Sequence, residues 1–99
     1  TAVTNVNKND FQVNVYPNPA SMSSVIKSSF ILKEDATVNM QILNSLGQIV
    51  SQPYSSFEIK GAHTIQWSAI ENSSLTPGMY FVQLSTDKGE RHVTKLILN

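Results

Sequence analysis

The sequence predicts an all-β domain, an antiparallel β-sandwich of about seven strands. Three observations lead to this prediction. No stretch of the 99 residues keeps the i, i+3, i+4 apolar spacing of an amphipathic helix. Short segments instead alternate apolar and polar side chains, with the period of two that half-buried strands show. Glycine and proline turn signals separate these segments at roughly regular intervals, as in a sandwich.

The composition fits one small globular domain and excludes several partner classes. The chain is 40% apolar, and its seven basic residues balance seven acidic ones. It therefore lacks the basic excess that nucleic-acid binding requires, and no apolar run approaches the roughly 20 residues that span a bilayer. There is no cysteine, which excludes disulfides and thiolate zinc sites. We expect neither a nucleic-acid partner nor membrane insertion.

The start of the chain predicts a linker followed by a first strand. Residues 1–10 are small and polar without a period, so we expect a linker from an upstream domain and a folded domain over residues 11–99. The segment 11–16 alternates, and the stretch Tyr16-Pro17-Asn18-Pro19 follows it. Each proline fixes φ, lacks an N–H and pushes the preceding residue toward an extended conformation. This motif should end the first strand and begin a rigid crossover between the sheets.

The middle of the chain predicts two strands and a hairpin. The segments 25–32 and 36–43 both alternate, the second more clearly. Asn44 through Gly47 carries turn chemistry, because glycine adopts positive φ without steric cost. The chain then returns as a strand at 48–50. Pro53 interrupts the segment 51–57, which we expect to be a sheet edge or a crossover.

The last part of the chain predicts three further strands. Gly61 opens an alternating segment that runs to Trp67, and the segment 68–75 allows at most one helical turn. The segments 78–85 and 91–98 form a second hairpin around Asp87-Lys88-Gly89.

The terminal strand has apolar residues on both of its faces. Val93 and Ile97 share one face with charged residues, whereas Leu96 and Leu98 lie on the other. Such a strand is either fully covered or presents one face to a partner. Both alternatives stay open from the sequence.

No catalytic or metal-binding constellation can be assembled. The two histidines, His63 and His92, lack a close ligand spacing, and no acidic run suits calcium. The chain has no G-x-S-x-G elbow and no glycine-rich phosphate cradle. We therefore expect no catalytic residues, no metal, no cofactor and no enzymatic activity.

The aromatic residues suggest an alternative function. Trp67, Tyr16, Tyr54 and Tyr80 are the rings that could stack on a sugar. Trp67 and Tyr80 share parity with aliphatic residues, which predicts core positions, whereas Tyr54 is the best candidate for an exposed ring. An exposed aromatic row would indicate a carbohydrate-binding or fibronectin-like accessory module of a secreted hydrolase. A further alternative is an adhesin-type structural domain, which predicts a large apolar surface patch.

Three stretches in order carry a resemblance to a known family. They are "VYPNPAS", "NMQILNSLGQIV" and "LTPGMYFVQLSTDKGERHVTKLILN". Together they resemble the C-terminal sorting domain (type A) of the type IX (Por) secretion system of Bacteroidetes, over about Phe11 to Leu98. The resemblance implies an Ig-like β-sandwich at the end of a larger secreted protein, without enzymatic activity.

The resemblance also implies a function, partners and a location. The domain would direct an upstream cargo across the outer membrane to the cell surface or medium, through the periplasm and the outer-membrane secretion machinery. A surface sortase-like protease would then cleave in or before residues 1–10, and the cargo would be anchored or released. By this resemblance the sorting motif comprises Tyr16, Pro17, Asn18, Pro19, Gly47, Pro77, Gly78, Tyr80, Gly89, Lys95, Leu96, Ile97 and Leu98.

A physical mechanism for recognition follows if the last strand lies at a sheet edge. Its free N–H and C=O groups would then pair with a strand of the receptor. We expect the closing hairpin, from Gly78 to Leu98, to offer this unpaired backbone. The same open edge would allow weak self-association.

Overall fold

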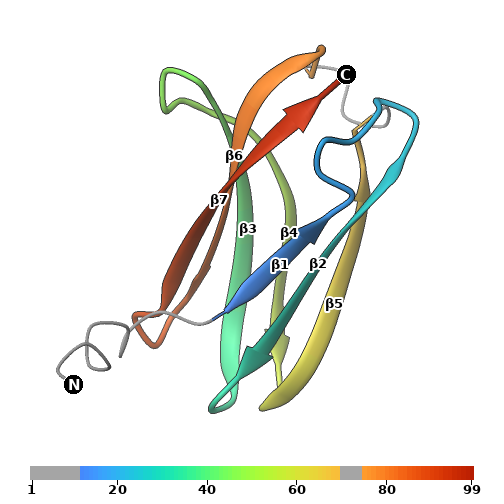
Figure 1. Cartoon of the computed structure of the whole chain (residues 1–99). Coiled ribbons are helices and arrows are strands. Elements are labelled where there is room, and N and C mark those ends of the chain that lie inside the picture. Colours follow the sequence, from blue (N-terminus) through green and yellow to red (C-terminus); the bar gives the residue numbers. More distant parts are fainter. Residues whose placement is uncertain (1–11, 70–74) are drawn as a thin grey trace, which may run out of the picture.

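The chain folds into two antiparallel sheets that pack face to face, which confirms the predicted all-β sandwich (Figure 1). This computed structural model describes residues 12–69 and 75–99. The strands are β1 (Val13–Tyr16), β2 (Val25–Leu32), β3 (Ala36–Asn44), β4 (Ile49–Glu58), β5 (Gly61–Ser68), β6 (Gly78–Thr86) and β7 (Arg91–Leu98). One sheet has the order β1-β2-β5, and the other has the order β4-β3-β6-β7. The linker expected at residues 1–10 lies outside the described residues, as does most of the helical turn expected within 68–75.

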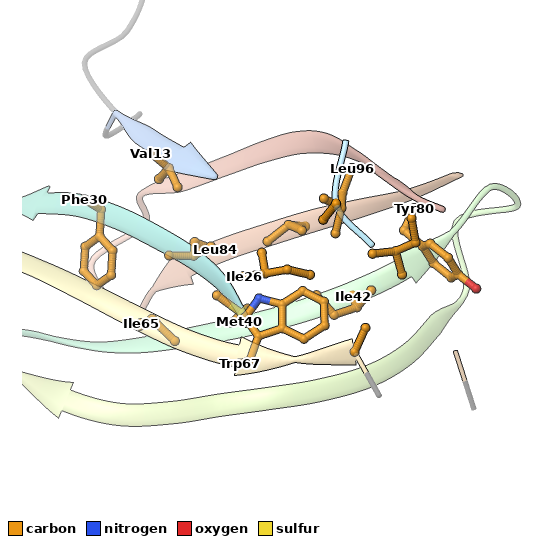
Figure 2. Packing of buried hydrophobic residues seen from close by; sticks show 14 of the residues in the cluster. Val13, Ile26, Phe30, Met40, Ile42, Ile65, Trp67, Tyr80, Leu84 and Leu96 are labelled. Atoms are coloured by element: carbon orange, nitrogen blue, oxygen red, sulfur yellow. The ribbon is translucent and has the colours of Figure 1, made fainter. Parts of the chain in front are cut away.

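The core lies between the two sheets and is built by the alternation seen in the sequence. Every second residue of β3, from Ala36 to Ile42, is fully buried. Trp67 and Tyr80 are 6% and 7% exposed, so both are core residues as predicted. Figure 2 shows them among the residues that both sheets contribute, which include Ile26, Phe30, Met40, Ile42, Ile65, Leu84 and Leu96. Burial of these apolar side chains is the main force that holds the sheets together.

The strand β4 differs from its prediction in one respect. It lies at a sheet edge, as expected, but Pro53 does not interrupt it. Tyr54 pairs with Met40 while Ser51 pairs with Ile42, so β4 carries an extra residue between them. This bulge accommodates Pro53, because a residue outside the regular ladder of hydrogen bonds does not need to donate an N–H.

The two ends of the sandwich are closed by different turns. At one end, the predicted hairpin between β6 and β7 turns at 87–90, and Asp87 Oδ1 accepts a hydrogen bond from the N–H of Thr37 at 3.0 Å. The hairpin between β3 and β4 closes the opposite end, where the last residue of the chain also lies (Figure 1). Within residues 12–69 and 75–99, no helix has the length and hydropathy needed to cross a membrane.

Candidate recognition site at one end of the sandwich

Nearly all of the sorting-motif residues predicted from the sequence lie at one end of the sandwich. The segment after β1, the β3–β4 hairpin, the start of β6 and the end of β7 meet there (Figure 1). The pairing shows this directly, since Asn44 pairs with Tyr80 and Gly78 pairs with Leu98. Gly89 is the exception, because it lies in the β6–β7 turn at the other end.

The proline motif crosses from one sheet to the other. The strand β1 ends at Tyr16 in the three-stranded sheet, and four residues later Ala20 forms a parallel bridge with Leu98 of the four-stranded sheet. We call residues 17–22 the edge strap. The peptide bonds before Pro17 and before Pro19 are both cis. The expected crossover between sheets is therefore present.

Five hydrogen bonds join the edge strap to the outer side of β7 and to Asn99, the residue that follows it. The N–H of Ala20 donates to the carbonyl of Ile97 at 2.8 Å, and the N–H of Asn99 donates to the carbonyl of Ala20 at 2.8 Å. The N–H of Met22 donates to the carbonyl of Asn99 at 3.2 Å. Asn18 supplies the other two: its Nδ2 donates to the carbonyl of Lys95 at 2.7 Å, and its Oδ1 accepts the N–H of Ile97 at 3.2 Å.

The side chain of Asn18 takes the place of a missing backbone partner. Pro17 and Pro19 have no N–H, so neither can donate to a neighbouring strand. A carboxamide offers one acceptor and two donors in a plane, much as a peptide group does. Asn18 therefore continues the ladder along β7 where the proline backbone cannot.

The expectation of a free terminal edge is wrong for the second half of β7. The strand is the last in its sheet, but the edge strap pairs with its outer side from Lys95 to Asn99. Outward-pointing backbone groups belong to alternate residues of an antiparallel edge strand. In the part of the chain that the structure describes, Arg91 and Val93 are the residues of β7 whose outer backbone groups have no strand partner.

The terminal residues divide between core and surface. Leu96 and Leu98 are 0% and 2% exposed and pack in the core, whereas Lys95 is exposed and Ile97 is half-buried. The alternation of a strand places Lys95 and Ile97 together on the outer face. This resolves the ambiguity of the terminal strand: its Leu face is core, and its Lys95 face is available to a partner.

Two further motif residues stabilise the same end. The hydroxyl of Tyr80 donates to the carbonyl of Thr76 at 2.7 Å and accepts the N–H of Thr76 at 3.1 Å. Gly47 has φ of 85° in the β3–β4 turn, where Asn44 Oδ1 accepts the N–H groups of Leu46 and Gln48. A side chain at Gly47 would have open space but an unfavourable backbone conformation. Tyr80 in the core and Gly47 in the exposed turn thus help to fix the shape of this end.

An apolar surface lies beside the motif residues, and the sequence did not predict it. Across the four strands, Ile49 pairs with Leu43, Leu43 with Phe81, and Phe81 with Lys95. Met79 pairs with Ile97 one step closer to the end of the sandwich. We define the apolar face as Leu43, Leu46, Ile49, Met79, Phe81 and Ile97. The signal was present in the sequence, since Leu43, Met79 and Phe81 are apolar residues at the positions of their strands that face solvent.

The groups considered for other functions do not come together at one place in the described part of the chain. His63 Nε2 donates to the carbonyl of Ile59 at 2.6 Å, and its Nδ1 lies 3.5 Å from Glu58 Oε1. Among residues 12–69 and 75–99 there is no group of three His, Asp or Glu side chains placed to hold a metal ion. Tyr54, expected to be exposed, is half-buried against the core and its hydroxyl donates to Glu58. Of the four rings considered, Tyr16 is exposed at 43%, whereas Trp67, Tyr80 and Tyr54 are buried or half-buried and do not extend it into an exposed row for a sugar.

Comparison with known families agrees with the geometry. None of the curated proteins matches the chain. The family model of the secretion-system C-terminal sorting domain matches residues 14–99, which include the edge strap, both hairpins and the terminal strand. The chain therefore belongs to the family of C-terminal sorting domains of the type IX (Por) secretion system.

Proposed function

We propose that this domain directs an upstream cargo protein across the outer membrane through the type IX secretion system. The single observation that carries the proposal is the family match over residues 14–99. It is supported by the gathering of the motif residues at one end, which gives a receptor one surface to bind. Export to the cell surface or the medium follows from this role.

The later steps of the pathway belong to the same proposal. After export, a surface sortase-like protease cleaves in or before residues 1–10, and the cargo is then anchored or released. The outer-membrane secretion machinery and this protease are the partners. The domain contributes binding and no chemistry, which is consistent with a family of sorting signals rather than enzymes.

A fusion tests the proposal directly. Residues 1–99 are attached to the C-terminus of a periplasmic fluorescent protein in a host that has the type IX system. Fluorescence on the cell surface or in the medium is expected, and retention in the periplasm would refute the proposal. The same fusion in a host that lacks the system is the control and should stay in the periplasm.

The adhesin-type alternative is separated by the same fusion. It also predicts an apolar surface patch, which the apolar face provides. It predicts, however, that export does not depend on the domain. A reporter without residues 1–99 that still reaches the surface would favour this alternative.

A further inference from the structure

The apolar face is unusual for the solvent side of a sheet. Ile49 and Met79 are 57% and 39% exposed, and the half-buried Leu43, Phe81 and Ile97 lie with them in two adjacent rows of paired residues. Leu46, 81% exposed, lies in the β3–β4 turn between Leu43 and Ile49 in the sequence. Directly paired side chains in a sheet lie in contact distance, so the paired residues form one continuous surface. A contiguous exposed apolar patch on a small domain indicates an interaction site.

Two of the three motif stretches supply this surface. Leu43, Leu46 and Ile49 come from the stretch around the β3–β4 hairpin, and Met79, Phe81 and Ile97 come from the last stretch, which holds β6 and β7. The need to fill the core explains why the inward-facing residues of these stretches, such as Tyr80 and Leu96, are apolar. It does not explain why the outward-facing residues are apolar as well. The outward half needs a separate explanation, because the core between the two sheets does not use it.

In the described part of the chain, a cation borders the apolar face and the carboxylates lie far from it. Lys95 is exposed and pairs with Phe81 at the edge of the apolar face. Five described carboxylates, those of Glu34, Asp35, Glu58, Asp87 and Glu90, lie at the turns of the opposite end of the sandwich. Within the described residues, the one ion pair joins His63 to Glu58 and does not involve Lys95. The ammonium group of Lys95 therefore pairs with no carboxylate among residues 12–69 and 75–99.

We propose that the apolar face docks onto a protein of the secretion machinery, whose contact surface is apolar and carries a carboxylate that pairs with Lys95. This inference rests on the proposed function and names the surface and the chemistry of its partner. Burial of the aliphatic and aromatic groups supplies the affinity. The Lys95–carboxylate pair fixes orientation and partner choice.

A distinct protein fits this surface better than an anionic lipid surface or a second copy of this domain. An anionic lipid surface is held by clusters of basic residues, whereas Lys95 is the one described cation that pairs directly with a residue of the apolar face. A second copy of this domain, docked face to face, would offer Lys95 no carboxylate, because the described residues of the face include none. A distinct protein can supply both the apolar contacts and the charge.

Two matched pairs of variants test the inference in the reporter fusion. Ile49→Asp is compared with Phe57→Asp: both residues lie on β4 and face outward, at 57% and 62% exposure, but Phe57 is at the other end of the strand. Lys95→Glu is compared with Arg91→Glu, since both are exposed on the same side of β7. Thermal melting of each purified domain, followed by the fluorescence of Trp67, confirms that it is folded.

The expected result is specific to one end of the sheet. Ile49→Asp and Lys95→Glu should lower secretion by about tenfold or more, as loss of a central contact residue does at protein interfaces. Phe57→Asp and Arg91→Glu should leave secretion within about twofold of the unmodified fusion, because surface changes outside an interface cost little. Overproduced untagged domain in the periplasm should compete with the reporter, and its Ile49→Asp form should not.

Other outcomes overturn the inference separately from the proposed function. If the unmodified fusion is exported and all four variants are exported equally, the docking surface is wrong while the sorting function stands. If the unmodified fusion stays in the periplasm, the proposed function fails and the inference falls with it. Flotation of the domain with phosphatidylglycerol vesicles that Ile49→Asp abolishes would assign the face to lipid. A dimer in sedimentation velocity that Ile49→Asp dissociates would assign it to a second copy.

Discussion

The outer faces of the two sheets differ in how they meet solvent. On the three-stranded sheet, the hydroxyls of Tyr16, Ser29 and Thr64 form a row across three strands, with contacts of 3.0 and 3.1 Å. On the four-stranded sheet, the corresponding rows near the motif end hold Ile49, Leu43 and Phe81. Polar groups on a surface can hydrogen-bond one another and water. Exposed apolar side chains contribute favourable free energy only when another surface covers them and removes them from water.

The difference shows that folding and recognition use different residues of the same strands. A sandwich needs apolar side chains only on its inner faces. Isolated exposed apolar residues, such as Ile31 on the three-stranded sheet, are ordinary on protein surfaces. A continuous apolar surface on one sheet and a hydroxyl row on the other separate the two roles by face.

The largest loss of stability should come from weakening the core that lies between the two sheets. Ile42→Ala removes a fully buried side chain and should lower the free energy of unfolding by about 2–5 kcal/mol. Leu43→Ala, the next residue on the outer face, should cost less than half as much. Urea denaturation of the two variants measures this. Equal losses would show that the apolar face is part of the folding core.

The second largest loss of stability should come from weakening the contact between the edge strap and β7. Asn18→Ala removes two hydrogen bonds to β7, and each contributes about 0.5–1.5 kcal/mol. Hydrogen exchange should accelerate at the amide of Ile97, while the amide of Leu96, which faces β6, keeps its protection. Asn14→Ala on the three-stranded sheet is the control. An unchanged exchange rate at Ile97 would contradict the role given to Asn18.

A third effect should appear in the turn that carries Leu46. Gly47→Ala places a side chain at φ of 85° and should cost about 1–2 kcal/mol. Gly47→Asn should recover part of this loss, because asparagine tolerates positive φ better than other residues. Thermal denaturation of the two variants decides the matter. If alanine and asparagine are equally harmful, crowding rather than backbone conformation is the cause.

The smallest effect should come from the hydroxyl row. Ser29→Ala breaks the two contacts between Tyr16 and Thr64, but all three groups can bond water instead. We expect a change within about 0.5 kcal/mol, as at most surface positions, and normal secretion of the fusion. A clear secretion defect in a folded Ser29→Ala domain would move recognition to the three-stranded sheet.

Local patterns in the sequence predicted most of the strands. The segment 25–32 and the hairpin around Asp87-Lys88-Gly89 were recognised from alternation and turn chemistry, and the structure confirms both. Pro53 correctly indicated a sheet edge, but the interruption expected there was wrong, because a bulge depends on the partner strand as well as on the proline.

The features that were not predicted depend on pairing between distant segments. The sequence showed that Pro17 and Pro19 end a strand, but it could not show that Asn18 would bond Lys95 and Ile97, which lie more than 70 positions away. The apolar face likewise requires the register that sets Leu43 beside Phe81 and Ile49. Each of these residues alone looks like an ordinary exception to the alternation.

The parallel alignment of the edge strap with β7 has a mechanical consequence. A pull toward the start of the chain, where a cargo would be attached, combined with a grip on the terminal strand, slides these two segments past each other lengthwise. Their five hydrogen bonds then bear the force together instead of opening one at a time. Stretching single molecules from both ends should therefore show a high rupture force, and Asn18→Ala should reduce it.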